Sequence, residues 1–221
     1  DELLKFIPEN LRINGSMGLE DGLSEFEVEN NLQSLMSKNN PATQGLCFLG
    51  GGSYDHYIPK IVDFIASRSE FYTAYTPYQS EVSQGTLQYL FEFQSMVCEL
   101  SGMDVSNASL YDGASAVAEA CSLAVNTTRR KKVAISSSIN PRYLDVVKTY
   151  MQNRNIDIDI IPCIGGFTDT KYTKLFRDEY AAIIIQTPNY WGLVEDLSPF
   201  KINDKTLLVS ISDPISLSIM K

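Results

Sequence analysis

The sequence is poor in the side chains that build most metal sites and catalytic triads. Among its 221 residues there is one histidine, His56, and no CxxC pair occurs among its four cysteines. Most zinc sites need several closely spaced histidines or cysteines, and a serine–histidine–acid triad would have to use His56. No apolar run approaches the roughly 18 residues of a membrane span, and no signal peptide opens the chain. These absences predict a protein without a metal site and without a membrane partner.

Positive charge is also scarce. The formal net charge is -9, from 18 lysines and arginines against 27 aspartates and glutamates, which argues against nucleic acid as a partner. The basic cluster at 129–132 follows a predicted helix and can compensate its dipole, with phosphate binding as the alternative. The scattered cysteines are typical of reduced, mostly buried thiols in a cytoplasmic protein: Cys47, Cys98, Cys121 and Cys163.

Helical patterns fill the first half of the chain. Ser24 and Glu27 form a capping-box pattern that begins a helix with an apolar stripe, and Pro41 stops it. We assign 1–45 as an N-terminal helical extension. A short amphipathic helix is predicted at 59–67. A longer one begins at about residue 83 and ends at Gly102, because glycine is the usual residue just past a helix end.

The second half alternates apolar runs with helical segments. After a brief apolar run at 108–111 and a small-residue helix at 116–125, the predicted strands are 133–136, 156–161, 181–186 and 206–211. Helices are predicted at 141–153 and 171–177. Continuous apolar strands separated by helices indicate a mostly parallel sheet covered on both faces. The sequence therefore predicts a three-layer α/β/α domain over 46–221; that it is an incomplete large domain is implied only by the family resemblance described below.

A polar loop at 71–85, with the sequence FYTAYTPYQSEVSQG, is the strongest candidate for a site. Pro77 restricts its own backbone and that of Thr76, so the loop is predicted to be semi-rigid. Rigid polar loops often carry binding or catalytic sites. A purely structural loop, whose tyrosines pack by their rings and make ordinary hydrogen bonds, is an equal alternative. The candidate residues are Tyr75, Tyr78, Gln79, Glu81 and Ser83.

Glycines and polar residues mark further positions. The glycines at 50–52 suggest either a close backbone approach or a simple chain reversal, and they match neither a dinucleotide fingerprint nor a P-loop. Ligands of parallel sheets bind beyond the carboxyl ends of the strands. There, the turn formed by Gly113, Ala114 and Ser115 opens a helix that could hold an anion or simply be capped. Asn189 and Asp213 follow two later strands, although a lone aspartate there is usually a turn former.

Two stretches resemble a known family. LGGGSYDHYIP and SRSEFYTAYTPYQSEVSQGTLQYLFEFQSMVCELSGMDVSNASLYDGASAVAEA closely resemble the P-protein of the glycine cleavage system, the pyridoxal-phosphate-dependent glycine decarboxylase. The resemblance runs from about Leu23 to the C-terminus and is to the first subunit in organisms that divide the enzyme into two chains. It implies fold type I of the aminotransferase superfamily. The chain is shorter than that subunit, so we expect it to be truncated within the large domain.

The resemblance also implies roles for single residues. Gly113, Ala114 and Ser115 would hold the cofactor phosphate, Asn189 would lie near the ring, and Asp213 would pair with the pyridine nitrogen. The family's Schiff-base lysine lies well beyond that aspartate, whereas this chain ends at Lys221. We therefore expect the second subunit to hold pyridoxal phosphate and this chain to be inactive alone. The polar loop would help to wall the partner's active site.

The expected function is that of a glycine decarboxylase subunit in a heterotetramer. Its expected partners are glycine dehydrogenase subunit 2, glycine and the lipoylated H-protein. A catalytically silent structural or regulatory partner of the second subunit is the alternative from another class. A stand-alone pyridoxal-phosphate enzyme such as an aminotransferase is a third reading, against which the lack of a well-placed lysine argues.

Overall fold

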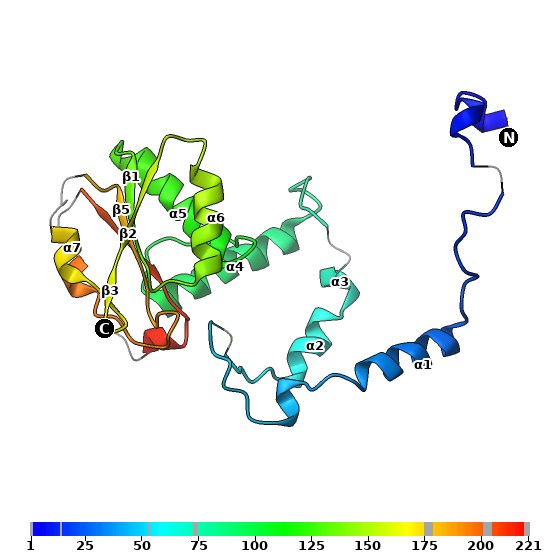
Figure 1. Ribbon diagram of the computed structural model, residues 1–221, viewed down its shortest axis with the longest axis horizontal. Coiled ribbons are helices and arrows are strands. Elements are labelled where there is room, and N and C mark those ends of the chain that lie inside the picture. Colours follow the sequence, from blue (N-terminus) through cyan, green and yellow to red (C-terminus); the bar gives the residue numbers. More distant parts are fainter. Residues whose placement is uncertain are drawn as a thin grey trace. The chain divides into compact units, whose positions relative to one another are not determined.

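The structure is a computed structural model, and it describes residues 2–13, 15–52, 54–72, 75–174, 179–200 and 205–218 (Figure 1). The chain divides into two compact units, Asp1–Phe48 and Leu49–Lys221. The domain assignment made from the sequence, with its boundary after residue 45, stays a prediction.

The first unit contains the helix α1, Glu25–Met36, and short 3-10 helices at Glu2–Leu4, Glu9–Leu11 and Ala42–Gln44. The capping box is present as predicted. Ser24 Oγ accepts a hydrogen bond from the Glu27 backbone N–H at 3.4 Å, and Glu27 Oε2 accepts one from the Ser24 backbone N–H at 2.8 Å. The helix ends at Met36, earlier than the sequence suggested. None of its residues is buried, so its apolar stripe contacts solvent.

Three helices occupy the start of the second unit: α2, Lys60–Ala66; α3, Ser69–Tyr72; and α4, Gln84–Ser101. Gly102 follows α4 with a φ of 71°, and its N–H donates to the Cys98 carbonyl oxygen at 2.8 Å. This is the glycine end that the sequence predicted. None of the three helices has a buried residue.

A four-stranded parallel sheet forms the centre of the second unit. Its strands are β1, Lys132–Ser136; β2, Asp157–Ile161; β5, Ala182–Gln186; and β6, Leu207–Ile211, in the order β2-β1-β5-β6. All four predicted strands are confirmed within one residue. Every residue of β5 is buried, because this inner strand is covered on both faces.

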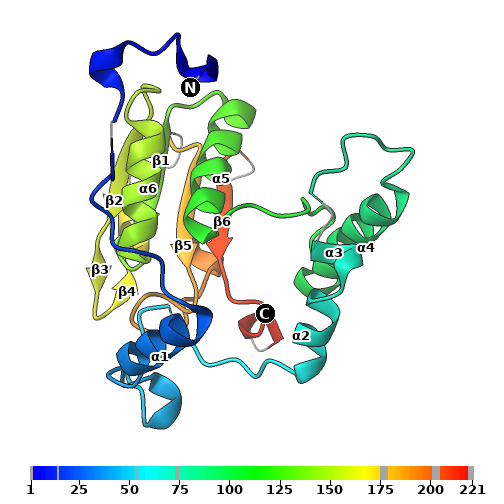
Figure 2. The same cartoon turned by 90° about the vertical axis from the view of Figure 1, so that its right-hand side faces the viewer.

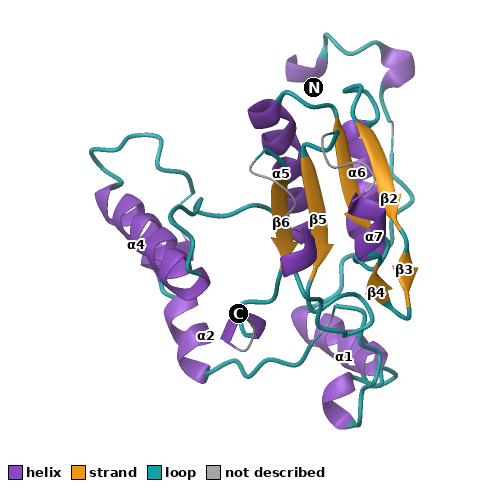
Figure 3. Cartoon of the chain, turned by 90° about the vertical axis from the view of Figure 1, so that its left-hand side faces the viewer, coloured by secondary structure: helices purple, strands orange, loops and turns teal. Residues whose placement is uncertain are grey.

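Helices cover both faces of the sheet, as the three-layer prediction required. The helices α5, Gly113–Thr128, and α6, Pro141–Met151, lie side by side on one face (Figure 2). Their core includes Cys121, Val147 and Met151 against Val133 and Ile184. On the other face a second core cluster contains Ile183, with side chains from α7, Thr170–Lys174, and from the 3-10 helix Ser198–Phe200 packed there (Figure 3).

The remaining elements are short. The apolar run at 108–111, which was not among the predicted strands, forms no strand in the structure. A short antiparallel hairpin, β3 at Cys163–Ile164 and β4 at Phe167–Thr168, was not predicted. Its turn has Gly165 and Gly166 at φ values of 61° and 87°, a left-handed conformation that glycine adopts without steric cost. The helix predicted at 171–177 is α7, and 175–177 lie outside the described residues. The last 3-10 helix is Ser216–Ser218.

The buried strand β5 gives the first testable prediction. Ile184 is fully buried, whereas Ile160 on the edge strand β2 is 38% exposed. We expect Ile184→Ala to lower the free energy of unfolding by about 2–5 kcal/mol, and Ile160→Ala by clearly less, because removing buried methyl groups leaves a cavity. Urea denaturation followed by circular dichroism measures both. Equal losses would contradict the assignment of the core.

Candidate functional site

The carboxyl ends of the strands meet at one edge of the sheet, as the arrows in Figure 3 show. The chain crosses from β1 to β2 on one side and later enters β5 on the other side, so the strand order reverses between β1 and β5. Ligands of open parallel sheets bind at such a reversal point. A cleft of about 230 Å³ lies there, and its polar lining residues are Tyr54, His56, Asn140, Tyr143, Gln186, Ser212 and Asp213.

Two side-chain amides connect the strands across the reversal point. Asn140 precedes α6 and caps it, since its Oδ1 accepts the Arg142 N–H at 3.0 Å. Its own backbone N–H donates to Gln186 Oε1 at 2.7 Å. Gln186 ends β5 and is 8% exposed. These two bonds orient both side-chain amides, because each amide oxygen accepts a hydrogen bond from a backbone N–H.

The three glycines at 50–52 pass close to this edge. Their φ values are 60°, 67° and 88°, in the left-handed region. A Cβ placed on Gly51 would lie 3.3 Å from the Tyr190 hydroxyl oxygen, and one on Gly52 would lie 3.5 Å from Asn140 Nδ2. The segment turns at 51–52 and also approaches Tyr190, so both interpretations that the sequence left open describe part of it.

Asp213 lies beyond β6 and faces the cleft. Its Oδ1 accepts the Ile215 N–H at 2.8 Å, as in a turn former. Its Oδ2 lies 3.7 Å from Nε2 of His56, a distance too long for a hydrogen bond. The side chains of His56 and Asp213 are 47% and 30% exposed. The carboxylate therefore keeps one oxygen that accepts no hydrogen bond from a described residue.

The helix start at Gly113, Ala114 and Ser115 is capped by the chain itself. Asp112 Oδ1 accepts the Ser115 N–H at 2.7 Å, and the hydrogen bonds from Ser115 lower the pKa of Asp112 below its ordinary value. An ionised carboxylate at this helix end repels a phosphate. The Tyr143 ring also lies against Gly113, where an added Cβ would be 2.5 Å from its hydroxyl oxygen. The structure thus shows the plain N-cap, the alternative to an anion site.

Asn189 is fully buried, and both ends of its side-chain amide are bonded within the chain. Its Oδ1 accepts the N–H groups of Trp191 and Leu193, each at 3.1 Å. Its Nδ2 donates to the Gly166 carbonyl oxygen and to Glu195 Oε1, each at 2.9 Å. The amide therefore holds its own loop together, and the expectation that Asn189 lies near a cofactor ring stays a prediction.

Glu195 is a buried carboxylate that the sequence analysis missed. It is 5% exposed. Its Oε1 accepts hydrogen bonds from the hydroxyls of Ser138 and Thr168, at 3.1 and 3.0 Å, and from Asn189 Nδ2. The Thr168 N–H lies 3.2 Å from both carboxylate oxygens. One carboxylate therefore connects the loops that follow β1 and β5 with the β3–β4 hairpin.

These residues do not fit pyridoxal phosphate as a resident cofactor of this chain. No lysine lines the described cleft, the helix end that would hold the phosphate carries Asp112, and Asn189 is buried. Lys221 lies outside the described residues. Within the described part of the chain no cluster of three or more potential metal ligands occurs. None of its described helices is long and apolar enough to cross a membrane.

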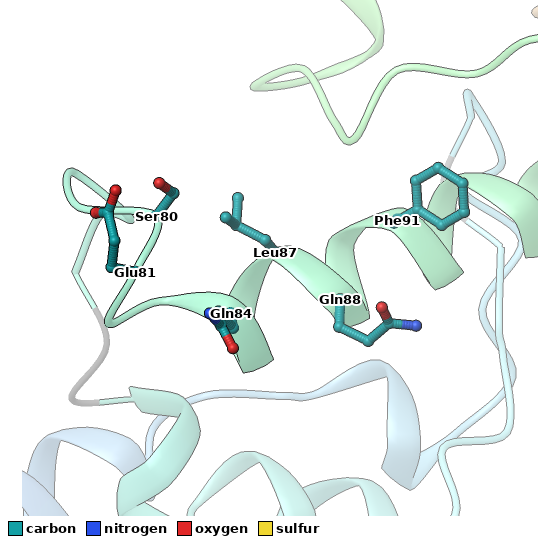
Figure 4. A pocket seen from close by; sticks show the side chains of 6 residues that line it. All are labelled: Ser80, Glu81, Gln84, Leu87, Gln88 and Phe91. Atoms are coloured by element: carbon teal, nitrogen blue, oxygen red, sulfur yellow. The ribbon is translucent and has the colours of Figure 1, made fainter.

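The polar loop forms a different, shallower region. A groove of about 460 Å³ is lined by Ser80, Glu81, Gln84, Leu87, Gln88 and Phe91 (Figure 4). Tyr75 and Tyr78 are 89% and 80% exposed, and their ring centroids lie 6.3 Å apart. Ser83 precedes α4 without a capping hydrogen bond from its side chain, and Gln79 is exposed. Of the five predicted residues, Glu81 alone lines the groove, and none lines the cleft.

The sequence analysis did not single out Asn140, Tyr143 or Glu195. Asn140 stands between an apolar strand and Pro141, which is the same strand-end signal that pointed to Asp213. The partners of Glu195 come from three separate loops, so no local pattern identifies it.

Glu195 gives the second prediction. We expect Glu195→Ala to lower the free energy of unfolding by about 3 kcal/mol, because its buried donors lose a charged acceptor. Glu119→Ala on the exposed surface of α5 should cost far less. Urea denaturation of both variants provides the measurement. A Glu195→Ala variant as stable as Glu119→Ala would show that the loops at this edge are held by other contacts.

Comparisons with known proteins agree along the whole chain. A family model described as "Glycine cleavage system P-protein" matches residues 1–221. Two relatives are named "Probable glycine dehydrogenase (decarboxylating) subunit 1". The one from Desulforamulus reducens is 49% identical over 100% of this chain and 50% of its own length. The one from Carboxydothermus hydrogenoformans is 47% identical over 100% of this chain and 51% of its own length. A crystal structure of glycine decarboxylase (P-protein) of the glycine cleavage system in inhibitor-bound form has a TM-score of 0.87 and 38% identity, over 100% of this chain and 50% of that one. The chain spans about half the length of the curated relatives that it matches.

Proposed function

Because the chain belongs to the glycine cleavage system P-protein family, we propose that it serves in a glycine decarboxylase, as part of that enzyme's first subunit. The holoenzyme would remove carbon dioxide from glycine and pass the aminomethyl group to the lipoyl group of H-protein. The observation that carries this proposal is the match over the whole chain to relatives named as subunit 1. The parallel sheet and its covering helices agree with fold type I of the pyridoxal-phosphate enzymes.

We infer that the partner subunit holds pyridoxal phosphate. The cleft at the strand ends of this chain is lined by no lysine, and the helix start beside it is capped by the anionic Asp112. A chain with these features supplies neither the amine for a covalent link to the cofactor nor a free helix end for its phosphate.

The polar loop is then the part of this chain that contributes to the shared active site. Exposed hydroxyl, amide and carboxylate groups at 75–84 are available to a second chain, whereas the polar groups of a structural loop would be bonded internally. Glu81 lies at one end of a groove that the apolar side chains of Leu87 and Phe91 also line, with Phe91 at the other end (Figure 4). Such a groove can orient a small polar substrate or an alkyl arm that carries a polar end. The proposed site residues are Tyr75, Tyr78, Gln79, Glu81 and Ser83.

The exposed apolar side chains support a subunit partner. Phe26 on α1, Phe64 on α2 and Phe91 on α4 are 75%, 62% and 68% exposed. Large exposed apolar side chains on several helices are typical of surfaces that a partner covers. This observation also favours the second candidate function, a catalytically silent chain that stabilises the catalytic subunit.

Substitutions in the loop distinguish the two functions. We expect Glu81→Ala and Tyr78→Phe to reduce turnover of the assembled enzyme by roughly ten-fold or more, the effect of losing about one hydrogen bond in the transition state. Assembly, followed by size-exclusion chromatography, should not change. Glu119→Ala on α5 and Tyr150→Phe on α6 make the same two side-chain changes outside the loop and serve as controls. Full turnover in both loop variants would favour the silent partner.

The location of the cofactor has its own test. We expect the full subunit that carries this chain, titrated alone with pyridoxal phosphate, to develop no specific internal-aldimine band in the visible spectrum. After borohydride reduction, the cofactor of the assembled enzyme should map to a lysine of the partner. A single reduced lysine in this chain, Lys221 included, would overturn the assignment.

A further inference from the structure

One long stretch of the sequence carries no positive charge. From Ser69 to Thr128 there is no lysine, arginine or histidine. The same stretch contains these acidic residues: Glu70, Glu81, Glu92, Glu99, Asp104, Asp112 and Glu119. The helix α4 lies within this stretch (Figure 1). The charged side chains of α4 are therefore all negative.

One face of α4 combines carboxylates with exposed apolar side chains. Met96 comes four residues after Glu92, three before Glu99 and four before Leu100, so these side chains are neighbours on the helix surface. Met96 and Leu100 are 56% and 73% exposed, and both glutamates are exposed. The partly buried positions of the helix lie on a different face and include Leu90, Gln94, Val97 and Cys98.

The segment that follows α4 extends this face. After Gly102 the chain folds back beside the helix, where Gln94 Nε2 donates to the Ser106 carbonyl oxygen at 2.5 Å. Met103 and Val105 in the returning segment are 64% and 84% exposed, and the residue between them is an exposed aspartate. We call the surface formed by Glu92, Met96, Glu99, Leu100 and the segment 103–105 the acidic face of α4.

The two glutamates of this face take part in no ion pair within the described part of the chain. The ion pairs of the described residues join other groups, such as Arg68 with Glu70 and Lys132 with Asp159. Glu92 accepts a hydrogen bond from Gln88 Nε2 at 2.8 Å, and this donor is neutral. Both carboxylates are therefore available to a cation from another molecule.

These features specify the chemistry of a fitting partner. Flexible methionine side chains adapt to apolar surfaces of different shapes, and exposed apolar grooves of this kind receive amphipathic helices. The carboxylates among them attract lysine and arginine. They repel nucleic acid, anionic lipid and a second copy of the same acidic face, because like charges across an interface are unfavourable. The chain described here is itself a poor source of the complementary charge, since its net charge is -9.

We propose that the acidic face of α4 binds an amphipathic helix of the partner subunit that carries lysines or arginines beside its apolar side chains. The proposal rests on the proposed assembly with a second subunit, and it adds which surface of this chain is used and which charge the partner presents. The acidic face shares no residue with the groove of the polar loop. It is thus independent of the proposed catalytic role of that loop.

Photo-cross-linking in the assembled enzyme tests the proposal. A benzophenone amino acid takes the place of Met96 in the full subunit and, as the control, of Leu123, which is 64% exposed on α5. We expect irradiation to join position 96 to one segment of the partner subunit. Mass spectrometry should identify that segment as an amphipathic helix with lysine or arginine beside its apolar residues. Position 123 should give a different segment or no product.

Association rates test the contribution of charge. Glu99→Gln and Glu119→Gln each remove one exposed carboxylate and change the net charge equally. At about 50 mM salt we expect Glu99→Gln to lower the association rate constant with the partner subunit about three-fold, because attraction between opposite charges speeds association. The effect should disappear at high salt. Glu119→Gln should keep the parent rate in stopped-flow fluorescence.

The apolar part of the face has a matched pair of variants. Leu100→Asp places a charge among the exposed apolar side chains of the acidic face, and Leu123→Asp makes the same change on α5. We expect Leu100→Asp to raise the dissociation rate constant about ten-fold or more, since a charge buried without a partner is costly. Leu123→Asp should dissociate as the parent does. Circular dichroism verifies that both variants are folded.

Several outcomes would overturn the proposal. Cross-links from position 96 to another part of the same subunit, to a second copy of this chain or to a partner segment without basic residues are three of them, and no cross-link is a fourth. Equal association rates for Glu99→Gln and Glu119→Gln would exclude the charge. Glycine turnover by the assembled parent enzyme tests the proposed function separately. An assembled enzyme without turnover would contradict that function, whereas turnover without the expected cross-link would contradict only the role of the acidic face.

Discussion

The carboxyl edge of the sheet depends on the buried carboxylate of Glu195. Parallel strands end in loops that have no ladder of their own, so the polar groups of these loops need other partners. Glu195 receives donors from Ser138 after β1, from Asn189 after β5 and from Thr168 in β4. A buried charge is costly unless such donors surround it, and together they compensate for the lost hydration. The cleft walls at Asn140 and Pro188 belong to the loops held in this way.

The elements that could be predicted from the sequence have local causes. The capping box at Ser24 and Glu27 and the glycine end at Gly102 depend on residues within one or two turns, and both are present. The four strands were predicted within one residue, and the clearest of them, β5, is a fully buried and nearly continuous apolar run. The β3–β4 hairpin escaped prediction because its strands have two residues each, too few for a periodic pattern.

The candidate site was predictable in position but less so in chemistry. Strand order places Asp213 and Gln186 at the same edge, and the cleft is there. Whether a polar side chain remains available depends on tertiary partners that composition does not reveal. Asn189 and Asp213 both follow strands, yet the amide of Asn189 is bonded at both ends while Asp213 keeps a carboxylate oxygen. Gly113 is a second case. The Tyr143 ring fills the space beside it that a phosphate would need, and Asp112 accepts the hydrogen bond of the Ser115 N–H.

The two polar regions therefore differ in how far this chain completes them by itself. The cleft is bounded on several sides by one chain, and its two side-chain amides are oriented by backbone donors. The groove of the loop is shallow, and the rings of Tyr75 and Tyr78 extend into solvent. Exposed side chains are held in one geometry only at an entropic cost, which a second protein surface can offset by packing against them. The groove of the loop thus needs a second surface to hold its exposed side chains in one geometry, whereas the cleft is bounded by this chain itself.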